Sequence, residues 1–266
     1  MNVIDLTKEH HELYFVCLED WSEDMKQAGE HKKLWFKHMK DKGLGVKLVV
    51  DDSGEIGGMI QYIPIEYSYV SGNDLYFILC IWVHNYHEGR GNFEGKGLGT
   101  ALLEAAEDDV KRRGKKGMVS WGMTADIWMK ASWYVKHGYS VVGKQRKPLP
   151  SRTLLWKPFT EDANPPKWIQ PIKKPELIPG KVVVTAFMNM WCPAYNRIFE
   201  LAKKGALELG DKVVFREINT FNSDNFLEWG ISYALFIDET QIRIGPPPHT
   251  TLEIIKNTIT KKVNEL

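Results

Sequence analysis

The chain has 266 residues, enough for two compact domains or one large one. Its 35 basic and 34 acidic residues are balanced locally as well, with 22 basic and 21 acidic residues through residue 158 and 13 of each after it. A chain without a concentrated positive field is a poor partner for bulk nucleic acid or an anionic membrane. The 43% hydrophobic and 26% charged residues are typical of a globular protein.

The three cysteines, Cys17, Cys80 and Cys192, are odd in number and far apart. They therefore predict neither a disulfide framework nor a paired-thiol zinc site, and they favour a reducing compartment. The first ten residues lack the basic and then apolar pattern of a signal peptide, and no apolar run approaches the roughly 18 residues that span a bilayer. We expect a cytoplasmic protein with no bound metal and no membrane or nucleic-acid partner.

A proline-rich segment divides the chain. Six of the 13 prolines fall within residues 158–179, where each fixes φ and removes a backbone donor. We therefore predict a linker over residues 159–179, which joins a domain of residues 1–158 to a second domain of residues 180–266.

The predicted elements before this linker alternate between strands and helices. The run over residues 75–83 is apolar on both faces, which is typical of a strand in the middle of a covered sheet. Strands are predicted over residues 2–6, 46–50, 56–69, 75–83, 117–123, 139–142 and 153–156. Helices are predicted over residues 10–20, 25–41, 98–113 and 126–137.

A glycine-rich segment, Gly95-x-Gly97-x-Gly99, lies between the predicted buried strand and an amphipathic helix. Glycine lets the backbone approach a ligand, and a helix start supplies unpaired N–H groups, so this segment suits a pyrophosphate. A glycine-rich turn without a ligand is the alternative. The spacing matches neither the phosphate loop of nucleotide hydrolases nor the dinucleotide fingerprint.

Two stretches resemble the signature motifs of the GNAT superfamily of acyl-CoA N-acyltransferases. The first runs from Trp82-Val-His through Glu94-Gly-Lys-Gly-Leu-Gly-Thr-Ala-Leu-Leu103, and the second is Ala131-Ser-Trp-Tyr-Val-Lys-His-Gly-Tyr139. The resemblance implies an α/β fold with a mixed central sheet over residues 1–158, and acetyl-CoA as cosubstrate.

The resemblance also assigns site residues. It implies that the CoA pyrophosphate binds backbone amides, that the main chain of Trp82 and Val83 pairs with the pantetheine arm, and that Tyr134 is the general acid. The amides are those of Gly95, Lys96, Gly97, Leu98, Gly99 and Thr100. Glu94 stands where the family usually has Arg or Gln, so we expect its side chain to face solvent or to be offset by Arg90 or Lys96.

The chemistry that this implies needs three functions. Attack of an amine on a thioester requires a base, a donor for the developing oxyanion, and an acid for the departing thiolate. The backbone N–H near Trp82 or Val83 is a candidate oxyanion donor. The base is open among His84, Glu88, Asp126 and a water relay, because the strand over residues 75–83 holds no carboxylate.

The second domain has a β-α-β, β-β-α order with Trp191-Cys192-Pro193 at the start of its first helix. It resembles the thioredoxin fold, and the whole chain is similar to YoaP-type acetyltransferases. Tyr195 occupies the position of the second thiol of a C-x-x-C motif, and no proline precedes the predicted third strand over residues 231–237. Cys192 is therefore either a single reactive thiol or inert.

These observations lead to one principal expectation and two alternatives. We expect an N-acetyltransferase that transfers an acetyl group from acetyl-CoA to a small-molecule amine through a ternary complex, with a tail that helps to form the acceptor site or a homodimer contact. The alternatives are a thiol-dependent redox or binding module that uses Cys192 beside an inactive CoA-binding domain, and a CoA-binding regulatory protein.

Overall fold

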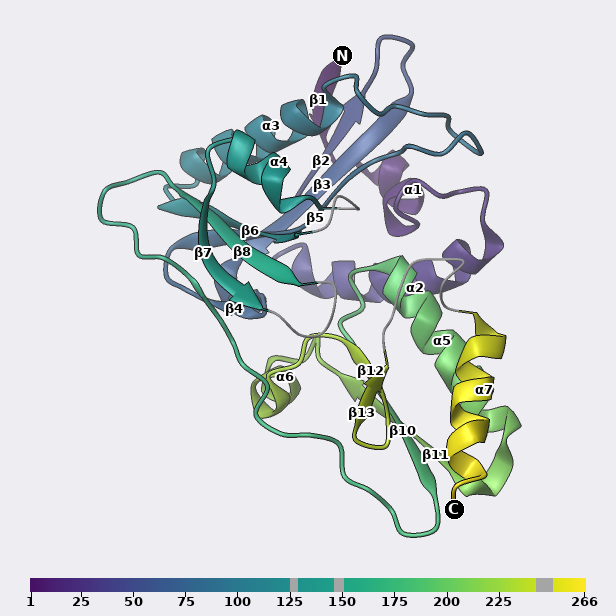
Figure 1. Cartoon of the computed structure of the whole chain (residues 1–266). Coiled ribbons are helices and arrows are strands. Elements are labelled where there is room, and N and C mark those ends of the chain that lie inside the picture. Colours follow the sequence, from purple (N-terminus) through teal and green to yellow (C-terminus); the bar gives the residue numbers. More distant parts are fainter. Residues whose placement is uncertain (125–128, 146–150, 243–250) are drawn as a thin grey trace. The chain divides into compact units, whose positions relative to one another are not determined.

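The computed structural model describes residues 1–124, 129–145, 151–242 and 251–266. These residues form two compact units (Figure 1). The first unit comprises Met1–Ser22 and Phe36–Ile169, and the second comprises Glu23–Trp35 and Gln170–Leu266. No helix in the described ranges combines the length and the apolar composition that crossing a membrane requires.

The first unit is built on a seven-stranded sheet in the order β1-β2-β3-β5-β6-β8-β7. Neighbouring strands are antiparallel except β5 and β6, which are parallel, so the predicted mixed sheet is confirmed. The strands are β1 (Asn2–Asp5), β2 (Gly45–Val50), β3 (Ile56–Pro64), β5 (Leu75–Val83), β6 (Gly117–Met123), β7 (Ser140–Gln145) and β8 (Arg152–Pro158).

Helices cover both faces of this sheet. On one face α3 (Leu98–Arg112) buries an apolar stripe that includes Leu102, Ala106 and Val110, as its helical spacing predicts. The short helix α4 (Ala131–Lys136) lies beside α3 in Figure 1. The opposite face carries α1 (His11–Phe15), whose aromatic residues pack against residues of β2 and β3.

Local backbone geometry changes several predicted boundaries. The predicted helix over residues 10–20 ends at Phe15, because Cys17 and Leu18 adopt positive φ angles of 51° and 69°. The next helix, α2, runs over Glu23–Met39. The predicted strand over residues 56–69 ends at Pro64 and continues as a 3-10 turn over Ile65–Tyr67.

The first unit extends beyond residue 158. A two-stranded pair forms between β4 (Val70–Ser71) and β9 (Lys167–Trp168), and the Trp168 ring stacks on Tyr69 with centroids 6.0 Å apart. Part of the proline-rich segment therefore packs on the first unit, because its single tryptophan has an aromatic partner there.

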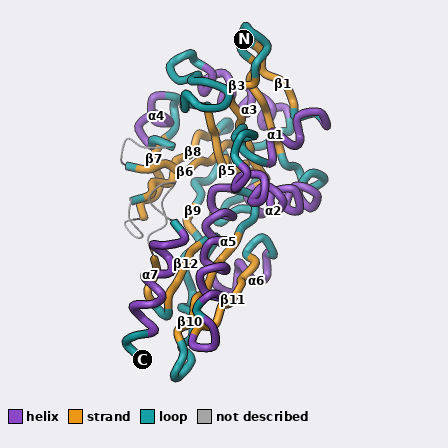
Figure 2. Tube along the Cα trace, turned by 90° about the vertical axis from the view of Figure 1, so that its right-hand side faces the viewer, coloured by secondary structure: helices purple, strands orange, loops and turns teal. Residues whose placement is uncertain are grey.

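The second unit has a four-stranded sheet in the order β11-β10-β12-β13. The central strand β10 (Val182–Met188) is parallel to β11 (Val213–Asn219) and antiparallel to β12 (Ala234–Ile237), which pairs with β13 (Thr240–Ile242). Figure 2 shows α5 (Pro193–Glu208) alongside β10 and β11. The remaining helices are α6 (Ser223–Trp229) and α7 (Leu252–Val263).

The helix α6 is absent from the predicted elements because its seven residues are too short for a periodic signal. Local capping defines it instead. The Asn222 side chain accepts hydrogen bonds from the N–H groups of Asp224 and Asn225, and Gly230 ends the helix with φ of 68°.

Candidate active site

The parallel strands β5 and β6 pair over only part of their length. Their register covers Leu75–Phe77 against Gly117–Val119, although β5 continues to Val83 and β6 to Met123. A bulge at Leu79 interrupts the pairing of β5 with β3, and the Trp121 indole N–H donates to the Leu79 carbonyl at 3.1 Å. The second half of β5, which holds Trp82 and Val83, thus has one edge that β6 does not pair.

The start of α3 presents backbone N–H groups that have no hydrogen-bond partner among the residues that the structure describes. The first intrahelical bond runs from the Ala101 N–H to the Gly97 carbonyl at 3.1 Å, so the N–H groups of Leu98, Gly99 and Thr100 precede it. Gly97 is the N-cap with φ of 80° and brings no capping side chain.

The space over this helix start is open. A Cβ atom at Gly95 or Gly97 would meet no atom within 4 Å, and both residues adopt positive φ. The three unpaired amides and the positive end of a 15-residue helix are therefore accessible to an anion. The helix start therefore has backbone groups of the kind that bind a phosphate group.

The acidic residue directly before the glycine segment is Glu94. It is exposed, and its N–H donates to the Asn92 side-chain oxygen at 2.8 Å. The Lys96 ammonium lies 4.9 Å from the centre of the Phe93 ring, which places a cation within the segment. Of the two arrangements expected for Glu94, the structure has the one in which the carboxylate faces solvent.

A hydrogen-bonded histidine joins α3 to α4. The His137 Nδ1 lies 2.8 Å from the Trp133 carbonyl, which can only accept, so Nδ1 carries a proton. The His137 Nε2 then accepts from the Thr100 hydroxyl at 3.0 Å when the ring is neutral. This contact ties Thr100, which directly follows the glycine segment, to the helix that carries Tyr134.

Tyr134 is fully buried between the sheet and α4. The helix can approach β6 because Gly122 has no side chain; a Cβ there would lie 2.7 Å from the Ala131 Cα. The Tyr134 hydroxyl donates to the Met129 sulfur at 3.5 Å. Burial raises the pKa of Tyr134 well above its usual value, and Ser120 on β6, which acts in the opposite direction, does not offset it. The phenol therefore stays protonated at neutral pH.

The candidate bases differ in burial. His84, directly after β5, is fully buried, and its Nδ1 lies 2.6 Å from the Gly91 carbonyl. Glu88 is exposed. Asp126 falls outside the described residues.

Two glycines of this site, Gly57 and Gly122, allow close packing that was not predicted from the sequence. Gly122 admits α4, as described above. A Cβ at Gly57 would lie 2.4 Å from the Phe93 ring and 2.8 Å from Leu98, so this glycine lets the glycine segment pack on β3. Their position inside predicted strands could have indicated this role, because a glycine within a strand often marks a place where another segment packs closely.

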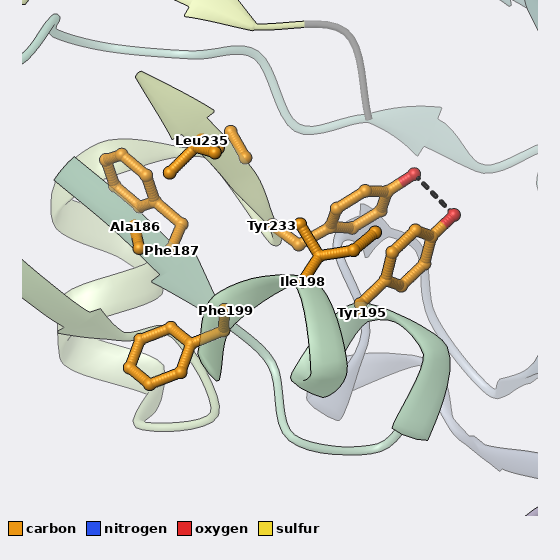
Figure 3. Close-up of a pocket in the computed structure, with 8 residues that line it drawn as sticks. Ala186, Phe187, Tyr195, Ile198, Phe199, Tyr233 and Leu235 are labelled. Carbon is orange, nitrogen blue, oxygen red and sulfur yellow. Dashed lines mark hydrogen bonds between the residues drawn. The ribbon is translucent and has the colours of Figure 1, made fainter. Parts of the chain in front are cut away.

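In the second unit, Cys192 is the N-cap of α5 and is 7% exposed. Tyr195, at the place of a second thiol, stacks on Tyr233 with ring centroids 3.9 Å apart, and the Tyr233 hydroxyl donates to the Tyr195 hydroxyl at 2.9 Å. Figure 3 shows this pair beside a pocket that Phe187, Ile198, Phe199 and Leu235 also line. Tyr195 is thus held by an aromatic partner, and it offers Cys192 no thiol with which to form a disulfide.

The comparison with family models matches residues 5–139, just over half of the chain, to the acetyltransferase (GNAT) family. No curated protein matches the chain. Similar solved structures include a ribosomal-protein-alanine N-acetyltransferase from Brucella melitensis, with 14% identity, coverage of 60% of this chain and 100% of that chain, and a TM-score of 0.44.

Two further structures match the chain. They are a GNAT-family acetyltransferase from Staphylococcus aureus Mu50 (14% identity, 60% of this chain and 99% of that chain, TM-score 0.42) and an aminoglycoside 6'-N-acetyltransferase complexed with coenzyme A (14% identity, 62% and 100%, TM-score 0.41). The family match includes the strands β3, β5 and β6 and the helices α3 and α4, which together form the candidate site. The chain belongs to the acetyltransferase (GNAT) family and is an acetyl-CoA-dependent N-acetyltransferase.

Proposed function

We propose that this protein transfers the acetyl group of acetyl-CoA directly to a small-molecule amine in a ternary complex, with Tyr134 as general acid. One observation carries the proposal: the open helix start lies beside both the end of β5 and the helix that carries Tyr134. A Cβ at Gly99 would lie 3.8 Å from the Val83 side chain and 3.5 Å from the ring of Trp133, the neighbour of Tyr134 on α4.

In this proposal the backbone of the glycine segment binds the pyrophosphate. The N–H groups and the helix dipole supply positive potential without a broad basic surface, which agrees with the net charge of +1. The residues concerned are Gly95, Lys96, Gly97, Leu98, Gly99 and Thr100. The main chain of Trp82 and Val83 binds the pantetheine arm along the edge of β5 that β6 leaves unpaired.

Tyr134 acts on the leaving group. Acetyl-CoA supplies a thioester whose C–S bond breaks as the amine attacks. The Tyr134 hydroxyl gives its proton to the departing sulfur. A backbone N–H near Trp82 or Val83 stabilises the developing oxyanion.

We propose that the second unit has a thioredoxin-like fold of the YoaP type. Along the sequence, the proposed domains are residues 1–158 and 180–266, with a linker between them. The proposal is supported by the strand order β11-β10-β12-β13, in which one parallel pair is followed by two antiparallel pairs. It is also supported by α5, which begins directly after Trp191 and Cys192. Because Tyr195 replaces the second thiol, Cys192 forms no C-x-x-C disulfide in this proposal.

The test is the release of free thiol from acetyl-CoA with a panel of small primary amines. We expect amine-dependent release that is retained in Cys192→Ser and falls steeply in Tyr134→Phe. Release that depends on Cys192 but not on Tyr134, or a mixed disulfide at Cys192 together with no amine-dependent release, would favour the thiol-dependent alternative and reject the proposal.

A further inference from the structure

The helix α4 ends in a motif that packs Tyr134 against Tyr139. Gly138 follows the helix with φ of 87°, and its N–H donates to the Val135 carbonyl at 3.1 Å. The Tyr139 N–H donates to the Tyr134 carbonyl, also at 3.1 Å. Together these features form a Schellman motif, in which the residues at these two places commonly touch. The two rings do so here, with centroids 5.3 Å apart and planes at 68°, so the place of the Tyr134 ring depends on Tyr139.

A lysine side chain crosses this motif. Lys157 lies on β8, whose backbone pairs with β6. A Cβ atom at Gly138 would lie 3.5 Å from Lys157 Cε, and the ammonium lies 5.8 Å from the centre of the Tyr139 ring. The ammonium ends at Glu107 of α3, with 2.7 Å between Nζ and Oε2. The Glu107–Lys157 strap thus joins α3 to β8 across the residues that follow α4.

Glu107 is an unusual residue for its position. It is 4% exposed and lies on the buried side of α3 with Leu103, Ala106 and Val110. Its second oxygen, Oε1, is also buried and has no hydrogen-bond partner among the described residues. Removing a carboxylate from water is costly, and replacing a buried ion pair with apolar residues is often neutral or stabilising. Stability alone therefore does not explain the Glu107–Lys157 strap, whereas orientation of the residues beneath it does.

The α3 helix contacts the end of α4 at two separate points. Thr100 and Glu107 are seven residues apart, so they lie on the same face of α3. The Thr100 hydroxyl lies 3.0 Å from His137 Nε2, near the helix start that is the candidate pyrophosphate site. Glu107 lies about two turns further along the helix and reaches Tyr139 through Lys157. The second contact is therefore next to Tyr134 but away from the helix start.

The charge of Glu107 also influences Tyr139. Burial raises the pKa of the Tyr139 hydroxyl, and the negative charge of Glu107 raises it further. The Tyr139 phenol therefore stays neutral at the pH of the reaction. A neutral ring beside Tyr134 adds no charge to its surroundings, so the contact between the two rings is one of packing and orientation.

We propose that Glu107 is a positioning residue for acetyl transfer: through Lys157 it holds Tyr139 against Tyr134, and so keeps the Tyr134 hydroxyl where it reaches the departing sulfur. This inference rests on the proposed function, in which Tyr134 is the general acid. Glu107 itself keeps its charge and exchanges no proton with the substrates. A displacement of about 1 Å at a reacting group lowers a rate by roughly 100-fold, so a contact away from the chemistry can have a large effect.

A matched pair of variants tests the inference. Glu107→Gln keeps nearly the size of the side chain but removes the charge that anchors Lys157. Asp109→Asn is the control, because it makes the same change on the same helix, where the carboxylate pairs with Arg113 at 2.8 Å. Each change is also made in the Tyr134→Phe background. For every protein we would measure kcat, the KM for acetyl-CoA and the melting temperature, with the amine that the wild type acetylates fastest.

We expect Glu107→Gln to lower kcat by roughly 10- to 100-fold. The KM for acetyl-CoA should not change, because the start of α3 is not part of the Glu107–Lys157 strap. In the Tyr134→Phe background the same change should lower kcat by less than about twofold, because no hydroxyl remains to be positioned. Asp109→Asn should keep kcat in both backgrounds, although its melting temperature falls.

The two backgrounds separate positioning from a merely structural role. Equal losses of kcat in both backgrounds would overturn the inference, since a general weakening of the fold does not depend on the Tyr134 hydroxyl. Wild-type kcat in Glu107→Gln, or a change in the KM for acetyl-CoA alone, would overturn it as well. These outcomes leave the proposed function in place. Wild-type kcat in Tyr134→Phe, or no amine-dependent thiol release by the wild type, would reject the proposed function and this inference with it.

Lys157→Met gives a second route to the same test if Glu107→Gln does not fold. The Lys157 side chain is 31% exposed, and methionine keeps most of the apolar stem that crosses Gly138 while it removes the ammonium. We expect kcat to fall in the wild-type background and to stay unchanged in Tyr134→Phe. A loss of kcat in both backgrounds, or in neither, would contradict the inference.

Discussion

Replacing Tyr134 with phenylalanine separates catalysis from stability. The hydroxyl donates to the Met129 sulfur at 3.5 Å, and because a thioether is a weak acceptor, losing this bond should cost at most about 1 kcal/mol of stability. Losing a general acid should lower kcat by about 10²- to 10⁴-fold, which corresponds to about 3–5 kcal/mol of activation free energy.

Tyr62→Phe is the matched control because it should show the reverse pattern. The Tyr62 hydroxyl donates to the Asp109 carboxylate at 2.7 Å, and a hydrogen bond to a charged group contributes about 1.5–3 kcal/mol. This variant should lose several degrees of thermal stability, at about 2–4 °C per kcal/mol, and keep its kcat.

The assay is thermal unfolding together with steady-state acetyl transfer for both variants. The expected result is a crossed pattern, in which Tyr134→Phe is stable but slow and Tyr62→Phe is less stable but active. Wild-type kcat in Tyr134→Phe would rule out Tyr134 as the general acid, and so would parallel losses of stability and activity in both variants.

Three further predictions concern packing, pH and capping. Gly57→Ala would place a Cβ 2.4 Å from the Phe93 ring, so we expect a loss of about 1–3 kcal/mol in thermal unfolding; an unchanged melting temperature would contradict this packing. Burial raises the pKa of Asp109, but hydrogen bonds from Tyr62 and Arg113 outweigh it and leave the pKa below 3.8. A carboxyl whose pKa is lower in the folded state stabilises the fold above its unfolded pKa, and this stabilisation is lost as the pH falls through the folded pKa. The free energy of unfolding in urea, measured at about pH 7 and pH 3, should therefore fall less with acid in Asp109→Asn than in the wild type. Asn222→Ala removes a side chain that accepts two helix N–H groups and should cost the second unit about 0.5–2 kcal/mol, whereas Asn222→Gly should cost only a few tenths.

Much of the fold could be predicted because its central strands have local signatures. The strands over 75–83 and 117–123 begin and end where predicted, since their apolar runs are bounded by turn residues and glycine. The helix α3 follows from its apolar spacing and from the glycine segment before it. These features depend on near neighbours in the sequence.

The rest depends on contacts between distant residues. The end of α1 is set by the positive φ of Cys17 and Leu18, which no local pattern indicates. The close approach of α4 to β6 depends on Gly122 facing Ala131 across a loop.

The surroundings of the candidate bases also lay beyond the sequence, because burial and hydrogen bonding depend on the fold. His84 is distinguished by its contact with the Gly91 carbonyl and by its two aromatic neighbours, and no spacing rule predicts either. Glu88 is exposed, so it lacks a surrounding structure that would orient it.

Calorimetric titration of acetyl-CoA into the wild type, Gly97→Ala and Gly114→Ala tests whether the start of α3 binds the cosubstrate. Both glycines adopt positive φ with open space at the Cβ position, and they lie just beyond opposite ends of α3. Each alanine should therefore cost about 1–2 kcal/mol of stability. We expect the wild type and Gly114→Ala to bind acetyl-CoA with equal affinity. Gly97→Ala should bind at least tenfold more weakly, which corresponds to a loss of about 1.4 kcal/mol of binding free energy. No binding by the wild type, or equal affinity in all three proteins, would contradict it.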